Sequence, residues 1–562
     1  MIRKRIIYCM MAATTMFAAS CTDFDDYNEA YTSGSAESRQ TVWENISNNA
    51  ELSDFAQLLV KGGYDKVLQG SNFVTVWAPK NGTYDFDSLL NRVDSTMLTD
   101  RFIKNHIANY NYNVSSPEDF RVYTQSEKSF VISGNTFGGV PMVEMNIPSV
   151  NGTLHLLDGC ADYNYNIYEY IFESPGAKMA EYFKHFEYDY FDADRSVLGP
   201  IDEFGRQTYS DSVIVTRNRL SERHLLDADL TDEDSLYTFI IPTDKAYEDA
   251  YSKIKSYFNY PSKGKIDYYQ LSEGADGPGS SLSASVQSEI LSDSLTGLNL
   301  VSNLVYSHNN TYNAWLPEIN RPDDVWQSDT ICTVKNIKLS NGKEFFDYTE
   351  DGKAMSNGYV YMADSLPVRS WDSWCPEINI NIFDRKTRPI STGCNVRTVN
   401  HQYNRFDPEI GDYITRHLYL DPISDNSQPE IYFNIDGVKS ATYNIYVVLL
   451  PENYNKTDNP VEEKVTQLTA EVSYYTEKQS LGKKEFGPVL TDSAKLGKID
   501  TLCLGEMTFP YSYVGTSAVP YLKLKIKRSK YNSKEKNYAY WLRIGAVILR
   551  PVEYDEYLKN ED

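Results

Sequence analysis

Two short sequence patterns, well separated along the chain, occur twice and in the same order. The first runs Thr75-x-x-x-Pro79-x-Asn81-x-x-Tyr84 and recurs as Thr238-x-x-x-Pro242-x-Asp244-x-x-Tyr247. The second is Ser149-Val150-Asn151-Gly152, followed by an apolar run, and it recurs as Ser356-Asn357-Gly358 before another apolar run. Two patterns repeated together in this way indicate a duplicated domain.

The repeated motifs resemble those of the fasciclin-like domain, a module of cell-surface adhesion proteins with no known active site. The resemblance places one such domain at residues 41–162 and a second, with a long insertion, at 163–370. Proline donates no hydrogen bond to a sheet, so Pro79 should end a strand that begins near Phe73. We expect Asn151-Gly152 and Asn357-Gly358 to form tight hairpin turns with positive φ angles, which a valine at Asn357 would strain.

The N-terminus has the features of an export signal. Arg3, Lys4 and Arg5 precede an apolar stretch that is too short to remain as a membrane-spanning helix. The stretch ends in small residues before Cys21, which resembles the lipobox of bacterial lipoproteins. The resemblance implies that residues 1–20 are removed, that Cys21 is lipidated, and that residues 21–40 form a tether. An ordinary signal peptide with a chance cysteine is the alternative.

Two further resemblances imply a protein on the cell exterior. The acidic run Thr22–Asp26 is similar to the surface-export signal of Bacteroidota lipoproteins, although a solvated acidic tether would look the same. A three-residue pattern resembles an O-glycosylation site of exported Bacteroidota proteins. It consists of Asp, then Ser or Thr, then an aliphatic residue or Thr. It occurs at Asp87, Asp94, Asp211, Asp234, Asp293, Asp329, Asp364, Asp492 and Asp500.

Composition indicates a globular chain with an acidic surface that should not bind polyanions. Hydrophobic residues make up 41% of the 562 residues, which is enough for real cores, and the formal net charge is −24. A surface of this sign should repel nucleic acid. Five cysteines lie beyond Cys21 without a Cys-x-x-Cys spacing, which favours free, buried thiols, although Cys375 and Cys394 could pair.

Beyond Pro376 the sequence alternates like short strands separated by turns. This part of the chain, taken as residues 371–562, predicts a β-sandwich. Its last strand, Leu542–Pro551, loosely resembles that of jelly-roll carbohydrate-binding domains. The predicted fold class is therefore α+β, with two tandem fasciclin-like domains followed by an all-β, jelly-roll-like sandwich.

No sequence motif points to catalysis. The chain lacks a Gly-x-Ser-x-Gly elbow, a His-Glu-x-x-His pair and a Walker loop. The acidic run Asp227–Asp234 lacks the glycine and glutamate of a calcium loop and is read as a solvated charge run. His106 and His155 have apolar neighbours and should be packed, hydrogen-bonded side chains. We expect no enzyme activity and no catalytic, cofactor or metal site.

Tryptophans are the predicted ligand contacts, because a flat aromatic ring can cover the apolar face of a sugar. The selected residues are Trp315, Trp326, Trp371 and Trp374, and the competing role for each is core or seam packing.

The resemblances together imply a non-enzymatic lipoprotein anchored in the outer membrane and facing outward. We expect an accessory subunit of a SusC/SusD-like importer that binds glycan or peptide and does not bind nucleic acid. A surface adhesin is the alternative, and a hydrolase hidden in the C-terminal domain ranks last.

Overall fold

The computed structural model describes residues 40–91, 96–115, 119–201, 203–222, 225–263, 282–311, 313, 330–407, 412–424, 427–451, 464–478, 480–491, 498–526, 538–539 and 541–561. Cys21, Trp315 and Trp326 lie outside these residues. The chain forms two compact units, and the first contains the short segments Thr231–Asp234 and Met355–Gly358 as well as the chain up to Tyr170. Among the described helices, none is both long and apolar enough to cross a membrane.

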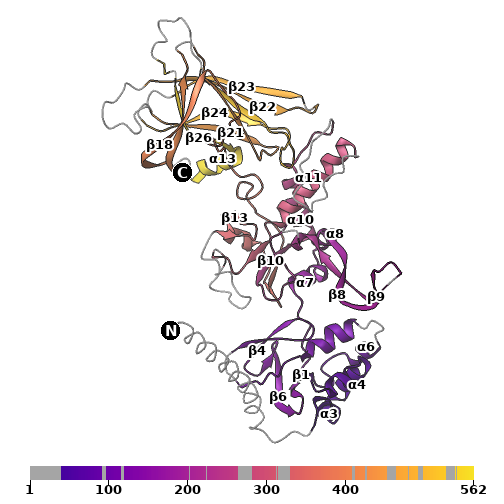
Figure 1. The fold of residues 1–562 in the computed structure, drawn as a ribbon. Coiled ribbons are helices and arrows are strands. Elements are labelled where there is room, and N and C mark those ends of the chain that lie inside the picture. The colour runs from indigo at the N-terminus through magenta and orange to yellow at the C-terminus, as the bar shows by residue number, and fades with distance from the viewer. Residues whose placement is uncertain are drawn as a thin grey trace, which may run out of the picture. The chain divides into compact units, whose positions relative to one another are not determined.

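The first unit packs helices against a mixed sheet (Figure 1). Its sheet has seven strands in the order β2 (Ile107–Ala108), β1 (Val74–Pro79), β7 (Gly152–Leu157), β6 (Val140–Ser149), β5 (Thr136–Phe137), β4 (Ser129–Ser133) and β3 (Phe120–Tyr123). Its helical elements are α3 (Val42–Ser47), η1 (Ala50–Leu52), α4 (Ser53–Lys61), α5 (Tyr64–Gln69), α6 (Phe86–Asn91), η2 (Thr96–Ile103) and η3 (Lys104–His106). Leu58, Val76 and Leu154 share one buried cluster, so the helices and the sheet close a common core.

The second copy of the motifs forms the same strand arrangement as the first. The order β2-β1-β7-β6 is matched by β11 (Val305–Ser307), β10 (Tyr237–Pro242), β15 (Gly358–Ala363) and β14 (Lys353–Met355). In both copies the residue after the motif proline donates a hydrogen bond to the neighbouring strand. The Lys80 N–H donates to the Leu157 carbonyl in β7, and the Thr243 N–H donates to the Ala363 carbonyl in β15. This shared topology is what a duplication predicts.

Each motif proline is followed two residues later by a side chain that caps a helix. The amide oxygen Oδ1 of Asn81 accepts the Asp54 N–H at 3.0 Å, and Asp54 is the second residue of α4. The carboxylate of Asp244 accepts the Lys178 N–H at 2.8 Å, at the second residue of α8 (Ala177–His185). A helix N-terminus leaves such N–H groups without intrahelical partners, so an Asn or Asp here stabilises the helix start.

The predicted Asn-Gly turns are wrong in detail. The residues between β6 and β7 are Val150 and Asn151, and neither has a positive φ angle. Gly152 has φ +148°, and a Cβ there would lie 1.8 Å from the carbonyl oxygen of Val74. The glycine is needed because the neighbouring strand passes so close. Asn357 likewise has no positive φ, so strain is not the reason for an asparagine there.

Asn151 and Asn357 are instead buried hydrogen-bond centres. Oδ1 of Asn151 accepts the N–H of Val42, the first residue of α3, at 2.8 Å. Oδ1 of Asn357 accepts the N–H of Ile167, the first residue of α7 (Ile167–Glu173), at 2.9 Å. The same motif residue therefore fixes the opening helix in both copies.

The second unit also contains helices, a long β-ribbon and two further antiparallel sheets. The helices are α9 (Arg219–Glu222), α10 (Asp244–Lys255), α11 (Ala284–Val301) and α12 (Gly342–Asp347), and the ribbon pairs β8 (Glu187–Ile201) with β9 (Gln207–Asn218). A small two-stranded sheet joins β12 (Ile331–Cys332) to β13 (Lys338–Leu339).

Residues after Pro376 form mainly strands, as the alternating pattern predicts. One sheet is ordered β18 (Cys394–Asp407), β19 (Asp412–Pro422), β26 (Leu542–Pro551), β21 (Thr442–Leu449) and β24 (Asp500–Thr508), with β16 (Ile378–Asn379) beside β26. The other is ordered β17 (Ser391–Thr392), β20 (Glu430–Asn434), β25 (Tyr521–Ile526), β22 (Gln467–Tyr475) and β23 (Leu481–Leu490). A final helix, α13 (Val552–Glu561), was not predicted. The jelly-roll order remains a prediction.

The five described cysteines are free, as predicted. Cys332 and Cys375 are buried, Cys160 and Cys394 are half-buried, and Cys503 is exposed. Cys160, Cys394 and Cys503 are therefore more exposed than the prediction of buried thiols implies.

His106 and His155 are packed and hydrogen-bonded, as predicted. His106 donates from Nδ1 to the Phe102 carbonyl at 2.8 Å and accepts the Ala161 N–H at 3.2 Å. His155 lies 3.1 Å from the Tyr112 carbonyl through Nε2. Both side chains are fully buried.

These two histidines should make the first unit sensitive to mild acid. Burial lowers the pKa of His106 and of His155 to about 4, from 6.5. The unfolded chain binds these protons near pH 6.5, so the stabilisation is complete above pH 6.5 and is lost as pH falls towards 4. We expect a loss of roughly 2 kcal/mol per histidine at pH 5, measured as a lower urea midpoint than at pH 7. Equal midpoints at the two pH values would contradict this assignment.

Candidate functional site

The first unit carries an open groove between three helices. Its lining residues are Trp43 and Ser47 from α3, Ala56, Gln57, Val60 and Lys61 from α4, and Leu90 from α6, and the open space is about 440 Å³. None of these seven residues is a carboxylate or a histidine, and their one titratable side chain, Lys61, donates to backbone carbonyls of α6.

Helix α3 is positioned so that Trp43 faces this groove. Thr41 accepts the Glu44 N–H at 3.2 Å, and the Glu44 carboxylate accepts the Thr41 N–H at 2.8 Å. This reciprocal capping box fixes where the helix begins. Because Val42 and Ile46 occupy the buried stripe, Trp43 and Ser47, four residues apart, lie on a different side.

Helix α4 forms a second wall of the groove, because its buried residues turn other side chains outward. Phe55, Leu58 and Leu59 are buried, which turns Gln57 and Val60 outward, and Val60 is 53% exposed. The Lys61 ammonium group donates to the carbonyl of Leu89, at 3.4 Å, and to that of Leu90. These bonds hold the end of α6 against α4 and so fix the third wall.

The groove therefore combines one aromatic ring with polar groups that both donate and accept. Gln57 can do both, Ser47 offers a hydroxyl, and Trp43 offers an indole ring that is only partly covered. Ligand sites in proteins usually join apolar walls to a few placed polar groups in about 300–1,000 Å³.

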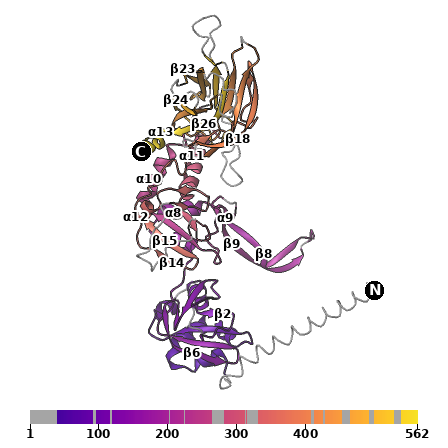
Figure 2. The same cartoon turned by 90° about the vertical axis from the view of Figure 1, so that its left-hand side faces the viewer.

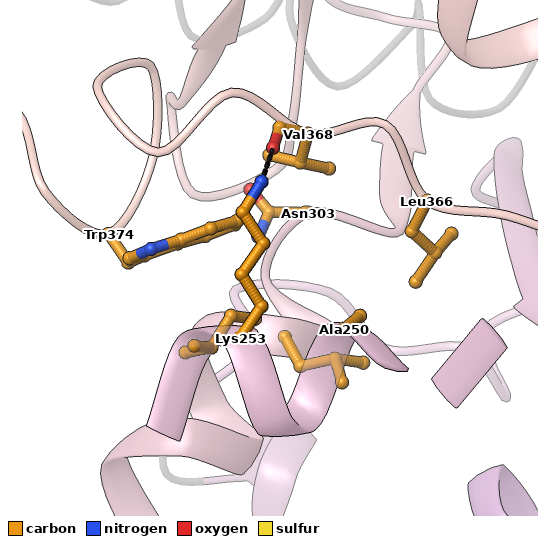
Figure 3. A pocket seen from close by; sticks show the side chains of 8 residues that line it. Ala250, Lys253, Asn303, Leu366, Val368 and Trp374 are labelled. Carbon is orange, nitrogen blue, oxygen red and sulfur yellow. Dashed lines mark hydrogen bonds between the residues drawn. The ribbon is translucent and has the colours of Figure 1, made fainter. Parts of the chain in front are cut away.

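Trp374, one of the predicted ligand contacts, lines a much smaller cavity in the second unit (Figure 3). The ring is 3% exposed, and the space beside it is about 10 Å³, room for one water molecule. Lys253 reaches across from α10, donating to the Val368 carbonyl at 3.4 Å, and lies 5.5 Å from the centre of the Trp374 ring. A sugar ring does not fit in this space.

Two buried polar atoms in the same cavity have no protein partner. They are the indole N–H of Trp374 and the side-chain oxygen of Asn303, and both residues line the space. A donor and an acceptor around a water-sized cavity suit a bridging water, which makes this a packing feature.

Trp371 is packed against α13. Its ring stacks on Tyr554, with centres 5.6 Å apart and an interplanar angle of 14°, and lies 5.2 Å from Tyr557. The Arg369 guanidinium lies 4.5 Å from the Tyr557 ring and donates to its hydroxyl at 3.0 Å. Trp371 thus helps to fix the final helix, and its role in ligand contact stays a prediction.

The polar face of the five-stranded sheet holds charges that neutralise one another. Glu471 is 7% exposed and lies 3.0 Å from Lys483 and 3.1 Å from Lys523. Burial alone would raise the pKa of Glu471, but the hydrogen bonds from the two lysines outweigh it, and the pKa is lowered.

No metal site is apparent in the described part of the chain. No group of three or more His, Cys, Asp or Glu side chains there could hold a metal ion. In the acidic run considered for calcium, Asp227 pairs instead with Lys335 at 2.6 Å.

Sequence reasoning overlooked Trp43. Trp43 directly follows Val42, and it is not on the helix face that Val42 and Ile46 define as apolar. This position in the sequence could have identified Trp43 as a residue outside the helix core. An aromatic residue displaced from such a stripe must face either another element or solvent.

Comparison with known proteins gives distant similarities only. No family model and no curated protein matches the chain. Among solved structures it is similar to the FAS1 domain pair of the insect cell adhesion molecule Fasciclin I, at 12% identity and a TM-score of 0.19, covering 58% of this chain and 99% of that one. It is also similar to the CBM22-2 xylan-binding domain of Xyn10C from Paenibacillus barcinonensis, at 9% identity and a TM-score of 0.20, covering 31% and 98%. At these values neither similarity assigns a family, a ligand or an activity.

Proposed function

We propose that this chain is a non-enzymatic surface lipoprotein that binds glycan in the groove lined by Trp43. The observation that carries the proposal is the partly covered indole ring set among Ser47, Gln57 and Lys61 in about 440 Å³ of open space. One face of a sugar ring presents C–H groups and its rim presents hydroxyls. The ring of Trp43 suits the first, and the polar side chains suit the second.

The N-terminal motif supports the cellular setting that we propose. Lipid on Cys21 would hold the chain at the outer membrane, facing outward, because each buried methylene contributes about 0.8 kcal/mol to anchoring. In that position a glycan-binding chain would serve a SusC/SusD-like importer by capturing its substrate. A surface adhesin that uses the same groove to hold host or matrix glycan is the second candidate.

Loss of the Trp43 ring should remove glycan binding. We expect Trp43→Ala to weaken affinity for the bound polysaccharide at least tenfold, about 1.4 kcal/mol, because the stacking surface is lost. Isothermal titration of the wild type and the variant against soluble polysaccharides and mixed peptides measures this directly.

Tyr110→Ala is the matched control, since Tyr110 is an aromatic residue of the same unit that is 68% exposed and does not line the groove. It should bind as the wild type does. Trp43 also packs against the core, so Gln57→Ala, which keeps that packing, should reduce affinity without changing the melting temperature. Unchanged affinity in both groove variants would refute the site, and binding of peptides alone would refute the glycan assignment.

A further inference from the structure

The ribbon formed by β8 and β9 extends away from the rest of the second unit (Figures 1 and 2). Its strands are 15 and 12 residues long, and they form a two-stranded sheet of their own. Two-stranded ribbons are marginally stable in water unless something else packs against them.

Exposed apolar side chains are concentrated on this ribbon. Large hydrophobic residues with substantial exposure include Tyr190 (39%), Phe191 (38%), Leu198 (66%), Ile201 (68%), Phe204 (73%) and Ile214 (61%). Single exposed apolar residues are ordinary, but a group on one projecting element marks an interaction surface.

Several of these side chains form a connected patch. Leu198 pairs across the ribbon with Tyr209, and the Tyr209 ring meets that of Phe191, with centres 4.7 Å apart. Phe191 in turn pairs across the strands with Ile214. Ile201, the last residue of β8, and Phe204, three residues further on, are the two most exposed of the six.

The ribbon is built into the fold at its base and braced along its length. At the base, Asn218 donates to the Phe183 carbonyl at 2.9 Å, and the Arg217 guanidinium lies 3.6 Å from the Tyr190 ring centre. Where the strand register shifts, Ser196 donates to the Asp192 carbonyl at 2.5 Å and accepts the Val213 N–H at 2.8 Å. A bulge held by hydrogen bonds is a specified feature of the sequence.

Charge narrows the class of partner. Residues 187–218 contain seven acidic and three basic residues, for a formal net charge of −4, within a chain of −24. Anionic lipid headgroups and nucleic acid would be repelled, and a second copy of this ribbon would carry the same negative charge. The complementary surface is an apolar cleft with a basic rim.

We infer that the β8–β9 ribbon docks into a protein partner that offers such a cleft, with Leu198, Ile201 and Phe204 as the anchors. Buried apolar and aromatic anchors at the centre of an interface carry most of its affinity, and complementary charge at the rim speeds association. This interaction is independent of glycan binding by the first unit.

The test uses the full-length chain, expressed with residues 1–40, in its native cells. Photoreactive benzoylphenylalanine in place of Phe204 should give one discrete protein adduct on irradiation, whereas the same group in place of Tyr110 should not. The protein recovered in that adduct is then purified and titrated against three forms of the chain. These are the wild type, the triple variant Leu198→Asp, Ile201→Asp, Phe204→Asp, and the matched control Gln207→Asp, Ser212→Asp, Thr216→Asp.

The control adds the same charge at three exposed polar positions of the ribbon. It should bind within a few-fold of the wild type, whereas the triple variant should bind at least 100-fold more weakly. The single variant Phe204→Asp, at the most exposed position, should lose at least tenfold and guards against misfolding of the triple variant. The inference would be overturned if all forms bound with equal affinity. It would also be overturned if the photoreactive chain gave no adduct, adducts to lipid alone, or adducts between two copies of this chain.

Discussion

Asn151→Leu is expected to destabilise the first unit by roughly 3 kcal/mol or more, one of the two largest effects anticipated here. Asn151 is 3% exposed, and its amide makes three hydrogen bonds, with the Val42 N–H at 2.8 Å and the carbonyls of Leu68 and Gly70 at 2.9 and 2.7 Å. Leucine has a similar volume but satisfies none of these groups. Each buried polar group left without a partner costs about 1–3 kcal/mol. Urea unfolding of the variant measures the loss.

A control from the same unit separates this effect from the loss of an amide in general. Asn45 donates to Ser149 at 2.8 Å from a more accessible position, so Asn45→Leu should cost less than about 1 kcal/mol. The equivalent change in the second copy, Asn357→Leu, should also destabilise, because it removes the acceptor for the Ile167 N–H. If Asn151→Leu and Asn45→Leu lowered the urea midpoint equally, the repeated asparagine would not have the role described above.

Lys128→Met should be the second large effect, costing about 3–5 kcal/mol. The Lys128 side chain is 6% exposed and lies 2.9 Å from Glu169 and 3.0 Å from Glu233, whose side chains are 30% and 14% exposed. Glu233 also accepts a hydrogen bond from Ser356 at 2.9 Å, so the cation joins three separate segments of the first unit. Removing it leaves two partly buried carboxylates facing each other without a counter-charge.

Lys104 provides the matched comparison. It pairs with Asp100 at 2.5 Å, but the two side chains are 34% and 49% exposed, so Lys104→Met should cost less than 1 kcal/mol. Adding Glu169→Gln and Glu233→Gln to Lys128→Met should recover much of the loss, since no uncompensated charge then remains. A cost below 1 kcal/mol for Lys128→Met, measured by urea unfolding, would show that the buried triad contributes little.

The parts of the fold that sequence predicts well are those where local chemistry and burial agree. Strand β1 ends at Pro79, as its missing N–H requires, and the duplication that the repeated motifs predict appears as the same strand order in both copies. The Asn-Gly dipeptides misled, because the same two residues serve either a tight turn or a buried cap. The tertiary structure decides between the two roles. Val74 passes so close that the glycine is required, and the start of α3 lies where the asparagine can accept a hydrogen bond.

The ribbon and the groove could not be predicted for a different reason. The β8–β9 ribbon leaves apolar residues such as Leu198 and Ile214 exposed, so the alternation of buried and exposed positions that identifies strands is weak there. The groove depends on how three helices pack, and Trp43 gains its role only from that packing. Sequence pointed instead to Trp371 and Trp374, whose rings stack on Tyr554 and lie buried, respectively.

Binding of glycan between α3, α4 and α6 is tested most directly by hydrogen–deuterium exchange of the full-length chain. The chain is compared with and without the polysaccharide that binds most tightly in the titrations. We predict slower exchange in peptides covering residues 41–61 of the wild type, with no change in the Trp43→Ala variant. Protection confined to residues 371–561, with residues 41–61 unaffected, would contradict the account and place the glycan site in the C-terminal sheets.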